Sequence, residues 1–249
     1  MKNLIKRMFS TEFIASQTID TVPEKNQLEV DTEPMPEIQE IQPLSKPNYA
    51  ELDSDYLEYA PEAVGYDNRE QQFGVYSAVA NIISNEDTIL DFGCGRGDFY
   101  AWYVQSFNRV PQYTGIDMNE PLINAGKRVY PEAALIHADW FDSDKFEEAD
   151  WCINVGSLNL RYDGDIVTSN TDYLAKTLDI MYTKARKGVI VLLASDIVNI
   201  TADELELGII AHNAGEVLDM ALKQFTPKGG FVALDHSYAN GLFNLIIYK

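Results

Sequence analysis

The sequence predicts an α/β fold of the doubly wound kind. We expect a mostly parallel, seven-stranded sheet with helices on both faces, a carboxyl-terminal antiparallel hairpin and an extended amino-terminal segment. Short apolar runs alternate with segments of helical periodicity in the part of the chain that starts at residue 51. A glycine-rich turn directly follows the first apolar run. Residues 237–241 alone join the last two runs, which is too short for a helical crossover.

The expected strands follow from short apolar runs. They are 88–92, 112–117, 133–138, 151–155, 189–194, 230–235 and 242–248. The last two should form an antiparallel hairpin at the edge of the sheet, because so few residues connect them.

The expected helices fill the intervals between these strands. Helical spacing predicts a helix around 73–83, a short one at 98–106 and another at 214–225. A further helix should begin near Asn119 and Pro121, because both residue types favour helix starts. The longest should run from about Thr171 to Gly188. It would place Lys184, Arg186 and Lys187 in its last turn, where cations interact favourably with the helix dipole.

The first 50 residues form an extension ahead of the domain at 51–249. Residues 20–50 are acidic and contain proline but no glycine, which predicts an extended linker. Residues 1–17 can form a short amphipathic helix with Lys2, Lys6 and Arg7 near its start. This helix could be an organelle presequence, a membrane-surface contact or a docking helix for a protein partner. A frayed tail is the alternative.

Composition and charge limit the function. The chain has 39 acidic and 19 basic residues, a net charge of -20 that disfavours a nucleic-acid partner. Cys94 and Cys152 are too few for a disulfide framework or a Cys/His metal site, so we expect no metal. No run has the length of a transmembrane segment. These features predict a soluble, cytoplasmic protein.

The strongest chemical signal is the turn after the first strand, Asp91-Phe92-Gly93-Cys94-Gly95-Arg96-Gly97-Asp98. Its spacing is GxGxG, whereas a dinucleotide fingerprint would need glycine at position 98. An acid at that position favours a cationic, amine-bearing ligand over a pyrophosphate. Asp117 and Asp139 end the next two strands, where they suit a ribose and an adenine amino group, with Trp140 able to cover the ring. Each feature alone is also compatible with a turn or helix cap.

In combination, these motifs resemble the class I S-adenosylmethionine-dependent methyltransferases across about residues 60–249. The closing antiparallel strand pair is similar to that family as well. The resemblance implies S-adenosylmethionine as cofactor, with Asp117 as the ribose acid and Asp139 as the adenine partner. The implied cofactor-binding residues are Asp91, Gly93, Gly95, Gly97, Asp117, Met118, Asp139, Trp140 and Asn154.

Two further segments resemble a small, little-characterised methyltransferase group. Residues 63–73 contain a Gly-aromatic and a Glu-x-Gln element before the first motif, and Gly156-Ser157-Leu158-Asn159 follows the fourth strand. Tyr66 and Gln72 are candidates to close over the cofactor or to pack structurally.

The candidate catalytic residues are Asn154, Ser157, Arg161 and His236. Arg161 could pair with an anionic group on the acceptor or lie at the surface. His236 could act as a general base or be an ordinary turn histidine. The segment after the fourth strand contains neither the Asn/Asp-Pro-Pro-aromatic tetrad nor the Pro-Cys pair of DNA methyltransferases.

The sequence therefore predicts an enzyme that transfers a methyl group to a small molecule or a protein side chain. The alternative is a protein of the same fold that acts as a tethered structural component, with catalysis incidental or lost. A nicotinamide oxidoreductase is disfavoured by Asp98 and by the closing hairpin.

Overall fold

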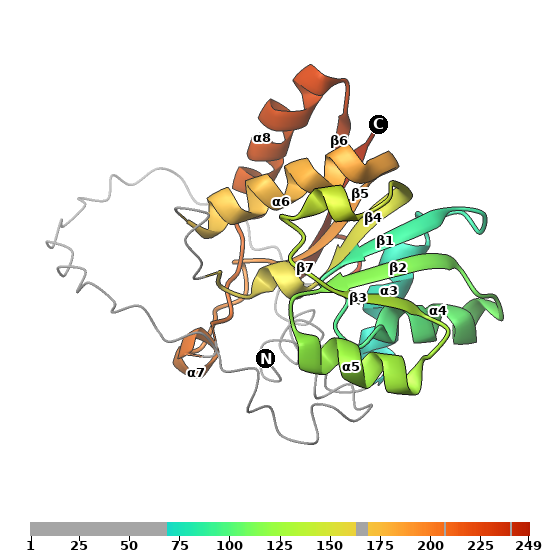
Figure 1. The fold of residues 1–249 in the computed structure, drawn as a ribbon. Helices are drawn as coiled ribbons and strands as arrows, with labels where there is room; N and C mark the ends of the chain where they lie inside the picture. Colours follow the sequence, from blue (N-terminus) through green and yellow to red (C-terminus); the bar gives the residue numbers. More distant parts are fainter. Residues whose placement is uncertain (1–68, 163–168, 207, 240) are drawn as a thin grey trace, which may run out of the picture.

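The computed structural model describes residues 69–162, 169–206, 208–239 and 241–249. The expected extension, residues 1–50, and Tyr66 lie outside these residues. The described chain forms three layers, a central sheet with helices on both faces (Figure 1). Within the described residues no helix is both long and apolar enough to cross a membrane.

The strands are β1 (Thr88–Phe92), β2 (Gln112–Asp117), β3 (Ala134–His137), β4 (Ala149–Val155), β5 (Ala185–Ala194), β6 (Phe231–Asp235) and β7 (Leu242–Tyr248). The α-helices are α3 (Arg69–Ala80), α4 (Asp98–Phe107), α5 (Glu120–Val129), α6 (Asn170–Lys184), α7 (Ala202–Glu206) and α8 (Ala214–Phe225). Short 3-10 helices are η4 (Ser143–Lys145), η5 (Ser157–Asn159) and η6 (Thr226–Lys228).

The sheet has seven strands in the order β3-β2-β1-β4-β5-β7-β6. The pairs from β3 to β5 are parallel, whereas β7 runs antiparallel to both β5 and β6. This confirms the predicted doubly wound fold with its carboxyl-terminal hairpin. Strand order reverses between β1 and β4, which is where open α/β sheets form a crevice at the carboxyl ends of their strands.

Strict alternation along β5 shows how the core divides between the two faces of the sheet. Val189, Val191 and Leu193 lie in the cluster that includes the buried residues of α6 and α8. Ile190 and Leu192 lie in the other cluster, with the buried residues of α3 and α4. Both faces are covered, which explains why the strand reads as a continuous apolar run. Figure 1 shows α6 and α8 on one side of the sheet and α3, α4 and α5 on the other.

The expectation of a helix from Thr171 to Gly188 is wrong at its carboxyl end. The helix ends at Lys184, and β5 begins at Ala185. Arg186 and Lys187 therefore belong to a strand. Arg186 pairs with Asp150, near the start of β4, and Lys187 pairs with Asp87, just before β1. Cations next to Lys184 looked like favourable helix-end residues, and the long-range partners that place them in a strand are not visible in the sequence.

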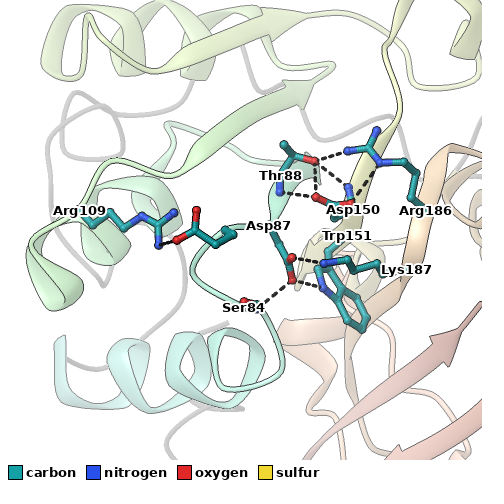
Figure 2. A network of polar contacts seen from close by, with 9 residues as sticks. Ser84, Asp87, Thr88, Arg109, Asp150, Trp151, Arg186 and Lys187 are labelled. Carbon is teal, nitrogen blue, oxygen red and sulfur yellow. Dashed lines mark hydrogen bonds and ion pairs between the residues drawn. The ribbon is translucent and has the colours of Figure 1, made fainter.

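Asp87, just before β1, is the centre of a polar network at the amino ends of the central strands (Figure 2). One carboxylate oxygen accepts from the indole N–H of Trp151 (2.8 Å) and from the backbone N–H of Ser84 (2.9 Å). The other oxygen pairs with the ammonium group of Lys187. Burial by itself raises the pKa of Asp87, but these hydrogen bonds outweigh it and hold the pKa below its ordinary value.

A second part of the same network ties β1 to β4 and β5. Asp150 accepts from both the backbone N–H and the hydroxyl of Thr88, and Arg186 donates to the opposite carboxylate oxygen at 3.1 Å. Arg186 also donates to the Thr88 hydroxyl at 2.7 Å. The network thus joins three strands to one another at their amino ends.

Replacing Asp87 by Ala should lower the free energy of unfolding by about 1–3 kcal/mol, because the buried indole N–H of Trp151 loses its acceptor. The pKa of Asp87 lies below 3.8 in the folded state, so its contribution is present above that value and is lost as the pH falls through the folded pKa. Urea denaturation at pH 7 and pH 3 measures this, and the difference from wild type should shrink at pH 3.

Asp219→Ala is the matched control. Asp219 pairs with Lys223 on the same helix, and both side chains are exposed. Its loss should change the free energy of unfolding by less than about 0.5 kcal/mol. Equal losses in the two variants would contradict the structural role of Asp87.

Candidate functional site

The glycine-rich turn joins β1 to α4 and follows a backbone path that residues other than glycine rarely adopt. Gly93, Gly95 and Gly97 all have left-handed φ angles, of 75°, 57° and 82°. The backbone N–H groups of Gly93 and Cys94 donate to the carbonyl of Ile116 in β2, at 2.7 and 3.0 Å. The turn is therefore held against the end of β2, and glycine provides its φ angles without strain.

Asp117, the last residue of β2, holds this turn directly. Its Oδ2 accepts from the backbone N–H of Gly95 (2.8 Å) and its Oδ1 from the backbone N–H of Asn119 (2.8 Å). Burial raises the pKa of the Asp117 carboxyl despite these two hydrogen bonds. Each carboxylate oxygen has accepted one of these hydrogen bonds and keeps a lone pair, so the group can also accept two hydroxyl donors from a ligand.

Gly95 and Gly93 differ in what surrounds them. A Cβ at Gly95 would have Leu122 as its nearest neighbour, at 4.0 Å, so the space beside this residue is open. A Cβ at Gly93 would lie 2.1 Å from the hydroxyl of Ser157, a distance that atoms cannot adopt. Glycine at 95 thus lets a ligand approach the backbone, while glycine at 93 brings the turn into contact with η5.

Asp91 lies on β1 beneath the turn, and its side chain is not at the surface. Its Oδ2 accepts from the hydroxyl of Tyr113 (2.7 Å), and its Oδ1 has no hydrogen-bond partner among the described residues. Burial raises the pKa of Asp91 to about 7, with the charge of Asp117 adding to the rise and the Tyr113 hydrogen bond opposing it. A positively charged donor placed against Oδ1 would satisfy both the hydrogen bond and the charge.

Asp98 has a different role from the one its position suggested. It is buried and pairs with Arg96, whose guanidinium nitrogen lies 2.7 Å from Oδ2. Burial raises its pKa, and Arg96 opposes that rise. The negative charge that seemed suited to a cationic ligand is therefore balanced by a neighbour within the turn.

Asp139 and Trp140 follow β3, which ends at His137. Asp139 is half-buried, and its Oδ1 accepts from the backbone N–H of Phe141 (2.9 Å). Trp140 is only 4% exposed and packs against Phe92 and Tyr173, with ring centroids 6.4 and 6.2 Å apart. Its indole N–H has no partner in the described part of the chain. Met118, in contrast, is 38% exposed beside Asp117.

Asn154 is the penultimate residue of β4, next to the glycine-rich turn, and is fully buried. Its amide donates to the carbonyl of Phe92 (2.7 Å) and to the hydroxyl of Ser157 (2.6 Å). Its Oδ1 is 3.4 Å from the backbone N–H of Leu158. The structure thus brings Asn154 and Ser157 together with the turn, and Asn154 fixes the relative position of β1 and η5.

The other two candidate catalytic residues are Arg161 and His236. The backbone N–H of Arg161 donates to the carbonyl of Gly208 (2.6 Å), which attaches the segment after η5 to the segment between α7 and α8. His236 follows β6, three strand spacings from β4 in the sheet, or about 14 Å. Its Nε2 is buried without a partner among the described residues. Of the four candidate catalytic residues, His236 lies farthest across the sheet from the turn.

Sequence reasoning did not identify Tyr113, Gly115 or the amide of Asn119 as parts of this site. Asn119 caps α5 through its Oδ1, and its Nδ2 is buried next to Asp117 without a partner among the described residues. Tyr113 and Gly115 could have been found from the period of two residues in a strand. This period puts residues 113 and 115 on the same face of β2, beside Asp91 of the neighbouring strand. The described residues contain no cluster of three or more His, Cys, Asp or Glu that could hold a metal ion.

Comparison with known proteins bears on the fold. Neither a protein-family model nor a curated protein matches this sequence. Solved structures do match. The plantazolicin methyltransferase BpumL, in complex with a triazolic desmethylPZN analog and SAH, is 15% identical over 82% of this chain and 92% of its own, with a TM-score of 0.57.

Two other structures are similar to the same extent. The methyltransferase domain of bacterial CtHen1-CN is 16% identical over 73% of this chain and 99% of its own, with a TM-score of 0.53. The magnesium protoporphyrin IX methyltransferase from Synechocystis PCC 6803 with bound SAH is 14% identical over 73% and 83%, with a TM-score of 0.53. At these identities the comparisons establish the fold.

Replacing Asp91 by Asn should raise the free energy of unfolding at pH 8 by on the order of 1–4 kcal/mol. The folded-state pKa of about 7 lies above the ordinary 3.8, so wild type loses stability as the pH rises between these values. A neutral amide avoids that loss. Urea denaturation from pH 4 to pH 8 should show curves that coincide near pH 4 and diverge above it. A difference that does not vary with pH would contradict the prediction.

Proposed function

Because this chain has the class I S-adenosylmethionine-dependent methyltransferase fold, we propose that it is a methyltransferase that uses S-adenosylmethionine. The observation that carries the proposal is the pairing of the glycine-rich turn with Asp117. Open space beside Gly95 adjoins a carboxylate that has lone pairs left for two hydroxyl groups. This is the combination that an adenosyl ligand with a ribose diol needs.

The residues of the turn and its neighbours fit the separate parts of the cofactor. Asp117 would accept from the ribose hydroxyls, and Asp139 would accept from the adenine amino group. The side chain of Met118, exposed next to Asp117, is better able than the buried ring of Trp140 to cover the adenine. The unpartnered oxygen of Asp91 would accept from the ammonium group of the amino-acid end. Gly93 and Gly97 would contribute their backbone to the shape of the turn.

Acidic surroundings support this ligand in particular. S-adenosylmethionine carries a sulfonium and an ammonium against one carboxylate, so it is a net cation. Asp91 and Asp117 are near enough for the charge of Asp117 to raise the pKa of Asp91. A cation bound between them would relieve that repulsion, which favours binding to the ionised form of the site.

The cofactor, when bound, supplies an electrophilic methyl group on a sulfonium sulfur. The task of the chain is to align the acceptor with that methyl group and to exclude water. Ser157 is half-buried and in contact with the turn, so it is the candidate to line the space next to the methyl group. Asn154 is fully buried and would act by holding the Ser157 hydroxyl in place. Arg161, further along the same segment, is the candidate to bind an anionic group on the acceptor.

We propose a small molecule or a protein side chain as the acceptor. The net charge of -20 repels polyanions, which disfavours nucleic acid. Among the similar structures, BpumL is in complex with desmethylPZN analogs, and another is named a mitomycin 7-O-methyltransferase, at 16% identity over 79% of this chain and 60% of its own, with a TM-score of 0.53. Small-molecule acceptors are thus compatible with this fold.

Replacing Asp117 by Ala should weaken S-adenosylmethionine binding at least about 30-fold, since the ribose loses its acceptor and the Gly95 N–H loses its anchor. Isothermal titration calorimetry at pH 7.5 measures the dissociation constants. Asp235→Ala is the matched control, because Asp235 also ends a strand and accepts from the backbone N–H two residues later, at 2.9 Å. Its affinity should equal that of wild type. No binding by wild type would refute the proposed cofactor.

Wild type incubated with S-adenosylmethionine labelled in the methyl group should transfer label to at least one acceptor in a cell extract. The extract is separated into small-molecule and protein fractions, and each is counted. Asp117→Ala should transfer far less label at the same cofactor concentration. Micromolar cofactor binding without transfer to either fraction would contradict the proposed acceptor classes.

A further inference from the structure

Tyr113 is a buried tyrosine of β2 to which the proposed cofactor contacts assign no role. Its hydroxyl donates to Oδ2 of Asp91 at 2.7 Å. Tyr113 is 7% exposed and Asp91 is 2% exposed, so water does not compete for this hydrogen bond. The contact spans two neighbouring parallel strands and lies directly beneath the glycine-rich turn.

Room for this hydrogen bond depends on Gly115. In the parallel register, Tyr113 lies opposite Ile89 and Gly115 lies opposite Asp91. A Cβ at position 115 would lie 2.9 Å from the hydroxyl oxygen of Tyr113 and 2.7 Å from the sulfur of Cys94. Both distances are shorter than Cβ contacts in proteins. The hydroxyl can therefore reach the carboxyl diagonally across the strands only because residue 115 has no side chain.

The hydrogen bond leaves the two oxygens of Asp91 in different states. Oδ2 is occupied by the tyrosine hydroxyl, whereas Oδ1 has no partner among the described residues. An unpartnered oxygen on a buried carboxyl is unfavourable unless a donor reaches it. A carboxyl free to rotate could offer either oxygen, but one fixed through Oδ2 offers Oδ1 in a single direction.

We propose that Tyr113 is a positioning residue for the amino-acid end of the cofactor, acting through Asp91, an inference that rests on the proposed function. Its hydroxyl fixes the orientation of the carboxylate, and Oδ1 then accepts from the ammonium group of the ligand. The adenosine end, which Asp117 and Asp139 would bind, does not depend on this contact.

The test uses two ligands that differ in one part. S-adenosylhomocysteine carries the amino-acid end, and 5′-methylthioadenosine has the same adenosine thioether without it. Tyr113→Phe removes the hydroxyl and keeps the ring. Calorimetry should show its affinity for S-adenosylhomocysteine falling about 10-fold, while its affinity for 5′-methylthioadenosine stays within about 2-fold of wild type.

Tyr100→Phe is the matched control. The ring of Tyr100 lies 5.4 Å from that of Tyr113, and its hydroxyl is buried without a partner in the described part of the chain. The same chemical change is thus made next to the proposed positioning residue. Both ligands should bind this variant as they bind wild type. A general effect of removing a buried hydroxyl would appear in both variants.

Asp91→Asn gives a second measurement that does not depend on how well Tyr113→Phe folds. This variant removes the charge that would bind the ammonium group. Its affinity for S-adenosylhomocysteine should therefore fall, while its affinity for 5′-methylthioadenosine should stay that of wild type. Equal weakening of both ligands in Tyr113→Phe, or no weakening of either, would overturn the inference. If wild type binds neither ligand, the proposed function itself fails. If wild type binds both ligands and Tyr113→Phe shows no selectivity between them, only the role of Tyr113 fails.

Discussion

One hydrogen bond organises the candidate site: the backbone N–H of Gly95 donates to the carboxylate of Asp117. It fixes the glycine-rich turn on the end of β2, and the left-handed φ angles of the turn make that path possible. Ser157 then fits against Gly93, and Asp91 is enclosed beneath the turn. A side chain at Gly93 would clash with Ser157 at the start of η5.

The acids at the two ends of the central strands have pKa values that are shifted in opposite directions. At the amino ends, hydrogen bonds lower the pKa values of Asp87 and Asp150, so these ionised groups stabilise the fold at neutral pH. At the carboxyl ends, burial raises the pKa values of Asp91 and Asp117, so their ionisation opposes folding. Buried carboxyls that reduce the stability of the fold are typical of binding sites, where a ligand supplies the missing partner.

Much of the fold could be predicted because the strands are short apolar runs and the helices carry apolar residues at helical spacing. The strands of the central sheet and the closing hairpin lie close to where the runs at 88–92, 151–155 and 242–248 placed them. The end of α6 could not be predicted from local pattern. Arg186 and Lys187 suit a helix terminus equally well, and their partners Asp150 and Asp87 lie far away in the sequence. Local propensity is a weak guide where long-range ion pairs decide the structure.

The sequence by itself determined which residues lie at or near the carboxyl ends of the parallel strands, because strand period and turn composition are local properties. Asp117, Asp139 and Asn154 were therefore expected at one edge of the sheet, next to the glycine-rich turn. Tertiary structure alone decided which side chains around the turn make contact with one another. Asp98 pairs with Arg96, Trp140 is buried in the core, and the hydroxyl of Tyr113 reaches Asp91 past Gly115. The register between strands and the packing of side chains set these contacts, and both depend on residues that are distant in the chain.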